Sequence, residues 1–106
     1  MNNIKTHFHW IDENGAIHQV ALGFLPYVPR VGECLSLIAR DEEANLWSIV
    51  LKFQVDKIAY EMFGRLLPAS KTWENDSQGG GCQVVLDVTP LDEQTRNYVQ
   101  MVSEDE

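Results

Sequence analysis

Basic residues are scarce in this sequence, since eight Lys and Arg side chains face sixteen Asp and Glu, for a formal net charge of −8. Binding to a phosphate backbone needs clustered Lys and Arg that displace counterions, and adhesion to an anionic membrane also needs basic residues. The composition therefore disfavours direct binding to nucleic acid or to a membrane. The acidity serves solubility or, as an alternative, mimicry of a nucleic acid by a carboxylate stripe that includes Asp41–Glu43 and Ser103–Glu106.

Cysteines and long apolar runs are equally limited. Cys34 and Cys82 each lie in an apolar run, where a free cysteine behaves as a small buried hydrophobe. The first seven residues lack the basic-then-apolar pattern of a secretory signal, and no apolar run reaches the ~18 residues of a membrane span. We therefore expect a cytoplasmic protein with reduced thiols, and a Cys34–Cys82 disulfide is the open alternative.

Signatures of catalysis and of metal binding are missing as well. Neither cysteine lies in a nucleophile motif, and a run such as Asp41–Glu43 is typical of a hydrated turn. Gly79–Gly81 leads into a strand without the Lys-Ser/Thr of a phosphate loop. His7 and His9 share one side of a predicted strand, but no third metal ligand accompanies them. We therefore expect no catalytic residue, no metal site and no cofactor.

What the sequence does contain is a period-two alternation of apolar and polar residues, which is typical of strands. It is clearest on both sides of Asp12–Gly15, which fits a type I turn whose glycine takes a positive φ as a G1 bulge. This turn pairs Trp10 with His18 and Phe8 with Val20. The predicted apolar face of the hairpin comprises Ile4, Phe8, Trp10, Val20 and Leu22.

The alternation continues in residues 34–39, 46–63 and 82–88. Within 46–63 the apolar phase slips at Asp56-Lys57, which indicates a β-bulge or a sharp bend. The many β-branched and aromatic residues favour a strand, although part of the stretch also matches a helical stripe. The prediction is one bent strand, and a helix is the alternative.

The remaining segments are predicted from their turn and helix signals. Residues 23–33 contain two prolines and are predicted to cross irregularly, and residues 64–81 are predicted to form a long loop. A helix is predicted after a Thr89 cap, with Pro90 at its first position. Its apolar face is predicted to comprise Leu91, Tyr98, Val99 and Val102.

Together these elements predict a strand-rich α+β fold. We expect five or six mostly antiparallel strands, forming a small barrel or a strongly curved sheet with one C-terminal helix. A single domain is predicted to span residues 1–102, followed by a solvated acidic tail at 103–106.

Two apolar segments lie where no strand pattern requires them. Trp73 lies in a polar segment, where it either caps the core or anchors a partner. The other segment flanks a proline and comprises Phe24, Leu25, Tyr27 and Val28. Surplus apolar residues of this kind mark a dimer interface or a ligand groove, so these five residues are the candidate interface.

The segment Val28–Glu33, which reads Val-Pro-Arg-Val-Gly-Glu, leads into the strand that starts Cys34-Leu35-Ser36-Leu37. It resembles a segment of small SH3-like barrel proteins of unknown function from phages, integron gene cassettes and other mobile elements. In those proteins a Pro-x-x-Gly-acidic turn feeds a barrel strand, and a strand carrying an aromatic follows, here Trp47 to Phe53. The resemblance covers roughly residues 22–60. It implies a fold and an accessory-gene origin, but no activity and no functional residue.

The leading hypothesis is a non-catalytic accessory protein that binds another protein and self-associates, with a homodimer expected. The alternative is a small-molecule-binding protein or divergent enzyme with a pocket at the junction of sheet and helix or of two protomers.

Overall fold

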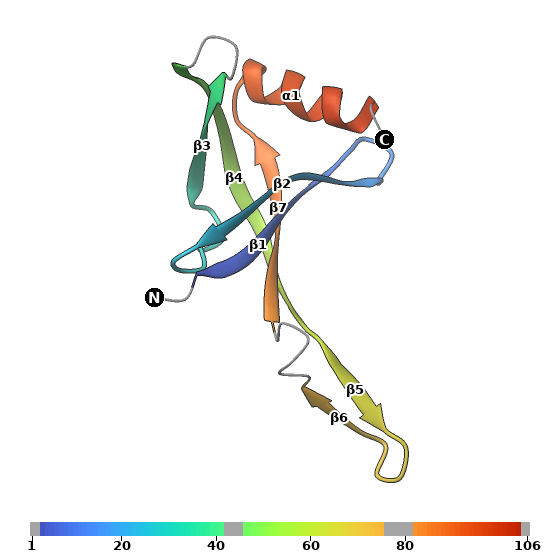
Figure 1. The fold of residues 1–106 in the computed structure, drawn as a ribbon. Helices are drawn as coiled ribbons and strands as arrows, with labels where there is room; N and C mark the ends of the chain where they lie inside the picture. Colours follow the sequence, from blue (N-terminus) through green and yellow to red (C-terminus); the bar gives the residue numbers. More distant parts are fainter. Residues whose placement is uncertain (1–2, 42–45, 76–81, 105–106) are drawn as a thin grey trace.

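The computed structural model describes residues 3–41, 46–75 and 82–104 of the 106-residue chain. Within these residues the chain forms seven strands and one helix (Figure 1). They are β1 (Ile4–Ile11), β2 (Ile17–Leu25), β3 (Cys34–Asp41), β4 (Leu46–Met62), β5 (Gly64–Leu67), β6 (Thr72–Asn75), β7 (Cys82–Pro90) and α1 (Glu93–Glu104).

Five of the described strands form one mixed sheet in the order β2-β1-β7-β4-β3. β1 and β7 pair in parallel and the other neighbours are antiparallel. The sheet curls into a half-barrel, α1 lies across one end of it, and β5 and β6 form a separate hairpin (Figure 1). The predicted strand-rich class, with a strongly curved sheet and a C-terminal helix, is confirmed.

The first two strands form the predicted hairpin. The Gly15 amide donates to the Asp12 carbonyl (3.0 Å), and the Asp12 amide donates to the Ala16 carbonyl (2.9 Å). Gly15 has a φ of 82°, the left-handed conformation that the G1 bulge requires. Trp10 pairs with His18 as predicted, and their ring centroids lie 5.6 Å apart.

A bulge further along β2 changes which of its side chains face the core. The register between β1 and β2 shifts after Phe8, which pairs with Ala21, so Val20 is an extra residue. The predicted Phe8–Val20 pairing is therefore wrong by one residue, although both side chains are buried. Because facing alternates along a strand, the extra residue turns Leu22 outward. Leu22, predicted to be inside, is exposed.

The long strand β4 bends where the sequence predicts. Its first half pairs with β3 and its second half with β7, and the register with β7 shifts between Val55 and Lys57. Asp56 is thus the bulged residue, and its carboxylate accepts a hydrogen bond from the Thr89 hydroxyl. The prediction of a bent strand is confirmed, and the helical alternative is wrong.

The segment predicted to cross irregularly begins later than expected, because β2 continues through Gly23–Leu25 by pairing with Ile4–Thr6. The turn that follows leads into β3. The Glu33 amide donates to the Arg30 carbonyl (3.1 Å), and the Arg30 amide donates to the Glu33 carboxylate (2.6 Å). The Pro-x-x-Gly-acidic segment is therefore a closed turn that feeds a strand.

Residues 64–81, predicted to be a loop, contain a second hairpin. β5 and β6 are joined by a turn at 68–71, in which the Lys71 amide donates to the Leu67 carbonyl (2.8 Å). The loop prediction failed because strands of four residues are too short to give a clear period-two signal. We call residues 64–75 the arm, which projects from the five-stranded sheet (Figure 1). Residues 76–81 lie outside the described residues.

The helix begins later than predicted. Pro90 is the last residue of β7 and pairs with Phe53, so Thr89 is a strand residue and not the cap. The cap is Asp92, whose carboxylate accepts the Thr95 amide (2.8 Å). Leu91, predicted on the buried helix face, precedes the helix and is exposed.

The other three residues predicted for the buried helix face contact the core. Val99 is buried in the cluster, and Tyr98 and Val102 pack against it. The helix continues through Ser103 and Glu104, so the prediction that these two residues belong to a solvated tail is wrong.

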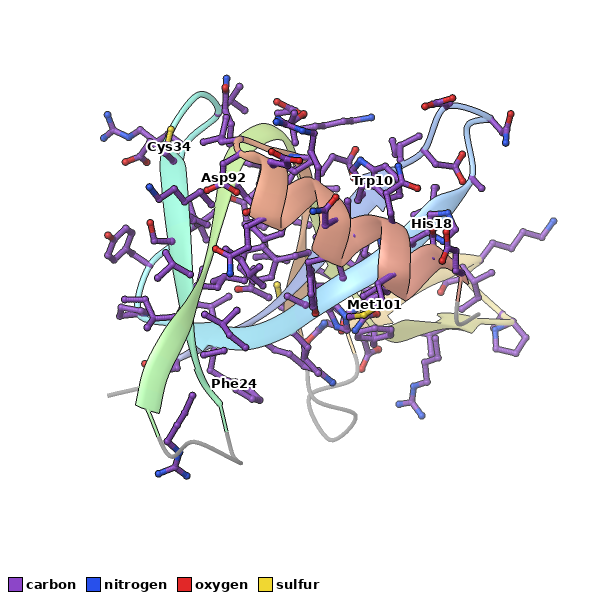
Figure 2. The ribbon with its side chains drawn as sticks, turned by 90° about the horizontal axis from the view of Figure 1, so that it is seen from above. Trp10, His18, Phe24, Cys34, Asp92 and Met101 are labelled. Carbon is purple, nitrogen blue, oxygen red and sulfur yellow. The ribbon has the colours of Figure 1, made fainter. Side chains whose placement is uncertain are left out.

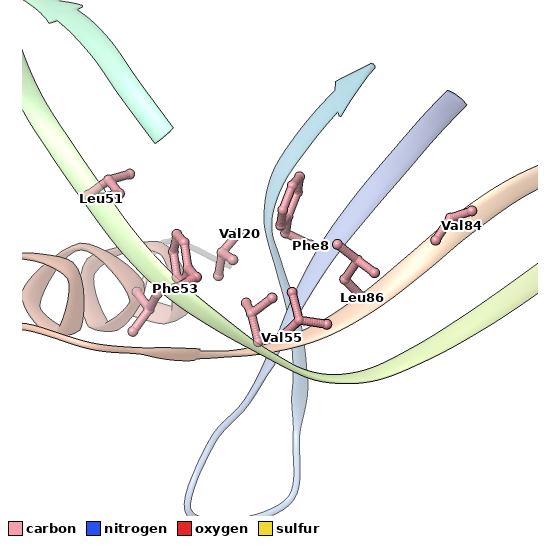
Figure 3. Packing of buried hydrophobic residues seen from close by; sticks show 9 residues of the cluster. Phe8, Val20, Leu51, Phe53, Val55, Val84 and Leu86 are labelled. Atoms are coloured by element: carbon pink, nitrogen blue, oxygen red, sulfur yellow. The ribbon is translucent and has the colours of Figure 1, made fainter. Parts of the chain in front are cut away.

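The core fills the concave side of the half-barrel (Figure 3). Trp10 packs against it, and Phe8 is 1% exposed, so both point inward as predicted. Alternation places every second residue of β4 and β7 on this side. The buried cluster comprises Phe8, Val20, Leu51, Phe53, Val55, Val84, Leu86, Val88 and Val99.

Candidate interaction surface

An apolar hollow of about 660 Å³ opens beyond the buried core, beside the N-terminal end of β1. Its apolar walls combine the end of β2 and the segment after it with the second half of β4 and the start of β7. Phe24 is 62% exposed and Tyr60 is 63% exposed, so water reaches these rings freely. The lining comprises Asn3, Ile4, Lys5, Phe24, Val28, Tyr60, Phe63, Cys82, Gln83 and Val84.

The hollow lies where the second half of β4 extends beyond β3, whose pairing with β4 ends at Cys34 and Gln54. Ile58, Tyr60 and Met62 follow the bulge and lie opposite Leu86, Val84 and Cys82. Ile58 still packs against the core, whereas Tyr60 and Met62 are exposed. The end of β4 therefore presents apolar side chains that no other element covers within the described residues.

The structure divides the candidate residues 24–28 between two environments. Phe24 and Val28 line the hollow. Leu25 packs against the core instead, and Tyr27 is exposed outside the lining. In Figure 2 the Phe24 side chain lies on the side of β2 away from α1. The bulge at Val20 produces this division, because it turns Phe24 outward and Leu25 inward.

Trp73 does not join this group, since it lies in β6 opposite Leu66 of β5. Its indole ring covers Gly64 so closely that a Cβ at Gly64 would come within 2.5 Å of it. Leu66 is 71% exposed. The arm therefore exposes the apolar side chains of Leu66 and Trp73 to solvent, and neither of its strands contains a buried residue.

Sequence reasoning missed Lys5, Tyr60, Phe63 and Cys82. The phase slip at Asp56-Lys57 already placed Tyr60 on the core side of the strand. What the sequence could not reveal is that β3 pairs with β4 only as far as Gln54, so β3 does not reach Tyr60. Lys5 is the one charged side chain among the described residues that line the hollow.

The convex side of the sheet carries a polar chain. The His7 ring nitrogen Nε2 lies 2.9 Å from Gln83 Oε1, and Gln83 Nε2 donates to Glu61 Oε1 (2.7 Å). His7 and His9 share this side, with ring centroids 6.2 Å apart. No group of three metal-ligating side chains occurs in the part of the chain that the structure describes. His7 is thus a hydrogen-bonding residue of this side, and His9 contacts its ring.

Both cysteines are free and exposed, so the prediction that they are buried is wrong. Each is the first residue of its strand, Cys34 on the edge strand β3 and Cys82 beside the hollow. Apolar neighbours in the sequence do not bury the first residue of a strand, because the sheet provides no cover there. The alternative of a disulfide between them is also wrong.

Two carboxyl groups have pKa values below the ordinary 3.8. For Asp12 the main cause is the hydrogen bond from His18 (2.7 Å), and the Ala16 and Asn14 amides contribute further. For Asp92 the cause is the Thr95 hydroxyl, then the Thr95 amide. Hydrogen bonds to the charged form favour it over the neutral acid. These carboxylates hold a turn and a helix end and do not face the hollow.

Several predicted features fall outside the residues that the structure describes. They are Glu42, Glu43, Gly79–Gly81, Asp105 and Glu106. The predicted carboxylate stripe and the glycine run therefore have no structural account.

No described helix has the length and the apolar character that crossing a membrane requires. No protein-family model, no curated protein and no solved structure matches the chain. The resemblance of Val28–Glu33 to SH3-like barrel proteins of mobile elements stays a prediction.

Proposed function

We propose that this chain is a non-catalytic accessory protein that acts by binding protein, and that a second copy of itself is its first partner. The observation that carries the proposal is the arm. Among the described residues, its two strands of four residues each pair only with one another, and they present Leu66 and Trp73 to solvent. An isolated two-stranded hairpin is marginally stable in water, so a partner that covers the arm would stabilise it.

The surroundings of the arm support the same proposal. Phe63, at the wall of the hollow, immediately precedes β5, so apolar surface continues from the hollow toward the arm. Large contiguous apolar surfaces on a protein of this size mark interaction sites. The aromatic side chains Phe24, Tyr60, Phe63 and Trp73 are of the types enriched at the centres of interfaces.

Two exposed free thiols fit a reducing compartment. We therefore propose that the protein acts in the cytoplasm.

The test compares arm variants with the parent chain by light scattering over a range of concentrations. We expect Trp73→Ala and Leu66→Ser to weaken self-association by about 2 kcal/mol or more, roughly 30-fold in Kd. At concentrations where the parent is monomeric, the melting temperature of both variants should stay near that of the parent, because neither side chain belongs to the buried cluster.

The matched control is Ile17→Ser. Ile17 is 62% exposed, similar to Leu66, but lies at the start of β2 beside the Asp12–Gly15 turn. This control should associate like the parent. Arm variants that associate like the parent would remove the arm from the proposed interface, and a chain that is monomeric at every concentration would refute self-association.

A second candidate function is binding of a small molecule in the hollow. Its volume lies within the range of about 300–1,000 Å³ usual for ligand pockets. Lys5 would orient a carboxylate whose apolar body lies on Phe24 and Tyr60. Maleimide labelling of Cys82, which lines the hollow, separates this candidate from self-association.

A further inference from the structure

The hollow and the arm are two apolar surfaces of one chain, and none of the described elements covers either of them. The hollow has aromatic walls and is open to solvent. The arm lacks a core of its own. Exposed apolar surface is removed from water most effectively when two such surfaces cover one another. The arm of a given chain projects away from the sheet (Figure 1), so the arm that reaches a hollow must come from another copy.

The distribution of charge favours a second copy at this place. The whole chain has a formal charge of −8, so two copies repel one another over most of their surfaces. Residues 60–75 carry Glu61 and Glu74 against Arg65 and Lys71, which cancel. Among the described lining residues, the hollow adds only the positive charge of Lys5. Two copies therefore meet with the least repulsion where the arm of one enters the hollow of the other.

Symmetry makes the contact reciprocal. In a two-fold symmetric pair, a residue that contacts a given site on the partner is matched by the same contact in reverse. If one arm fills the partner's hollow, the partner's arm fills the first hollow, and both surfaces are covered at once. A standard interface takes about 800 Å² from each partner, which is roughly a tenth of the 7645 Å² surface of this chain.

We infer that the chain forms a two-fold symmetric dimer by arm exchange, in which the arm of each copy lies in the hollow of the other. This inference rests on the proposed self-association and adds its geometry. It places Leu66 of one copy near Phe24, Tyr60 and Cys82 of its partner, since these three residues line the hollow.

Native Cys82 provides the test. In a chain that carries Cys34→Ser and Leu66→Cys, held at a concentration above the weakened Kd of this variant, mild oxidation should join residue 66 of one copy to Cys82 of the other. The product is a covalent dimer of twice the 12.1 kDa chain mass, and peptide mass spectrometry identifies the linkage. The dimer should be lost when Cys82→Ser is added. In the Cys34→Ser background, Ile17→Cys is the control that should give no linkage to Cys82.

A second measurement needs no substitution. In the single chain Cys82 and Cys34 are both exposed, so both react readily with a maleimide. In the dimer the arm shields Cys82 and leaves Cys34 open. Dilution should therefore raise the labelling rate of Cys82 severalfold and leave that of Cys34 unchanged.

The outcomes separate this inference from the proposed function. A dimer that lacks both the linkage to Cys82 and the shielding of Cys82 overturns arm exchange but leaves self-association in place. A chain that is monomeric at every concentration overturns both. A monomer in which Cys82 becomes shielded only when a small carboxylate with an apolar body is added also overturns both, and assigns the hollow to a small ligand.

Discussion

Thr95 connects the helix to the sheet through one hydroxyl group. The residue has no exposure to solvent, and its hydroxyl accepts the backbone amide of Lys52 in β4 (2.8 Å). The carbonyl of Lys52 accepts the Leu91 amide (2.9 Å), just before the helix. These bonds satisfy backbone groups of β4 where β7 no longer pairs with it. A small polar side chain thus sets where the helix begins relative to the sheet.

Replacement of this hydroxyl tests the role. Thr95→Val keeps the shape but leaves the Lys52 amide without its partner, so we expect the free energy of unfolding to fall by about 1–3 kcal/mol. Chemical denaturation measures the change. Thr95→Ser keeps the hydroxyl, so its free energy of unfolding should fall much less. Equal losses in the two variants would attribute the effect to packing of the methyl group.

Predictions for single residues succeeded where a local pattern determines the environment. Phe8 and Trp10 face the core because the Asp12–Gly15 turn fixes the register of their strand. The predictions that Leu22 and Cys82 are buried failed for non-local reasons. Leu22 is turned outward by a bulge that no turn signal marks, and Cys82 starts a strand opposite Met62, which is itself exposed. Trp73 was recognised as unusual, but its partner Leu66 was not, since pairing in the arm depends on a turn at 68–71 that the sequence left unidentified.

At the scale of elements, the β1–β2 hairpin depends on the charge of Asp12. Its carboxylate accepts the amides of Asn14 and Ala16 and the ring nitrogen of His18. The pKa of Asp12 is lowered in the folded chain, chiefly by the bond from His18. The stabilisation from the ionised group is therefore complete above the unfolded pKa and is lost as the pH falls through the lower folded pKa.

This dependence predicts how Asp12→Asn behaves in acid. At neutral pH the variant should melt below the parent, because it lacks the charged acceptor. As the pH falls below the ordinary carboxyl pKa of 3.8 and through the lower pKa of folded Asp12, the difference in Tm should shrink, since the parent loses its ionised carboxylate over that window. Thermal melts at several pH values measure it. A difference that is constant across the window would show that the charge of Asp12 does not contribute.

The elements that the sequence predicted well are those with strong alternation. The hairpin and the bent strand β4 are present with their predicted turn and bulge. The arm was missed because four-residue strands resemble a loop. The start of the helix was misplaced because Pro90, a typical first residue of a helix, here ends a strand. The candidate site was predicted less well than the fold. The hollow depends on how far β3 extends along β4, and the alternation pattern does not determine that extent.

For the whole molecule, charge and association oppose one another. The formal charge of −8 repels a second copy, whereas the proposed contact surface is close to neutral. Salt shortens the screening length from about 30 Å at 0.01 M to about 10 Å at 0.1 M. Repulsion between distant carboxylates weakens over that range, and apolar contacts are little affected.

We therefore expect added salt to tighten the dimer, with a lower Kd at about 0.1 M than at about 0.01 M NaCl. Sedimentation equilibrium at the two salt concentrations measures this change. A Kd that rises with salt would mean that attraction between opposite charges holds the copies together, contrary to an apolar contact.

The position of β7 in the sheet has a consequence for how the chain is made. β7 is the middle strand of the five and the last of the described strands along the chain. As the ribosome releases the polypeptide, β1–β2 and β3–β4 can each form a pair early. They share no interior until β7 emerges between them. We therefore expect nascent chains to expose Phe8 and Phe53 until β7 has been released, so that the late pairing of β1 with β7 is the step that closes the core.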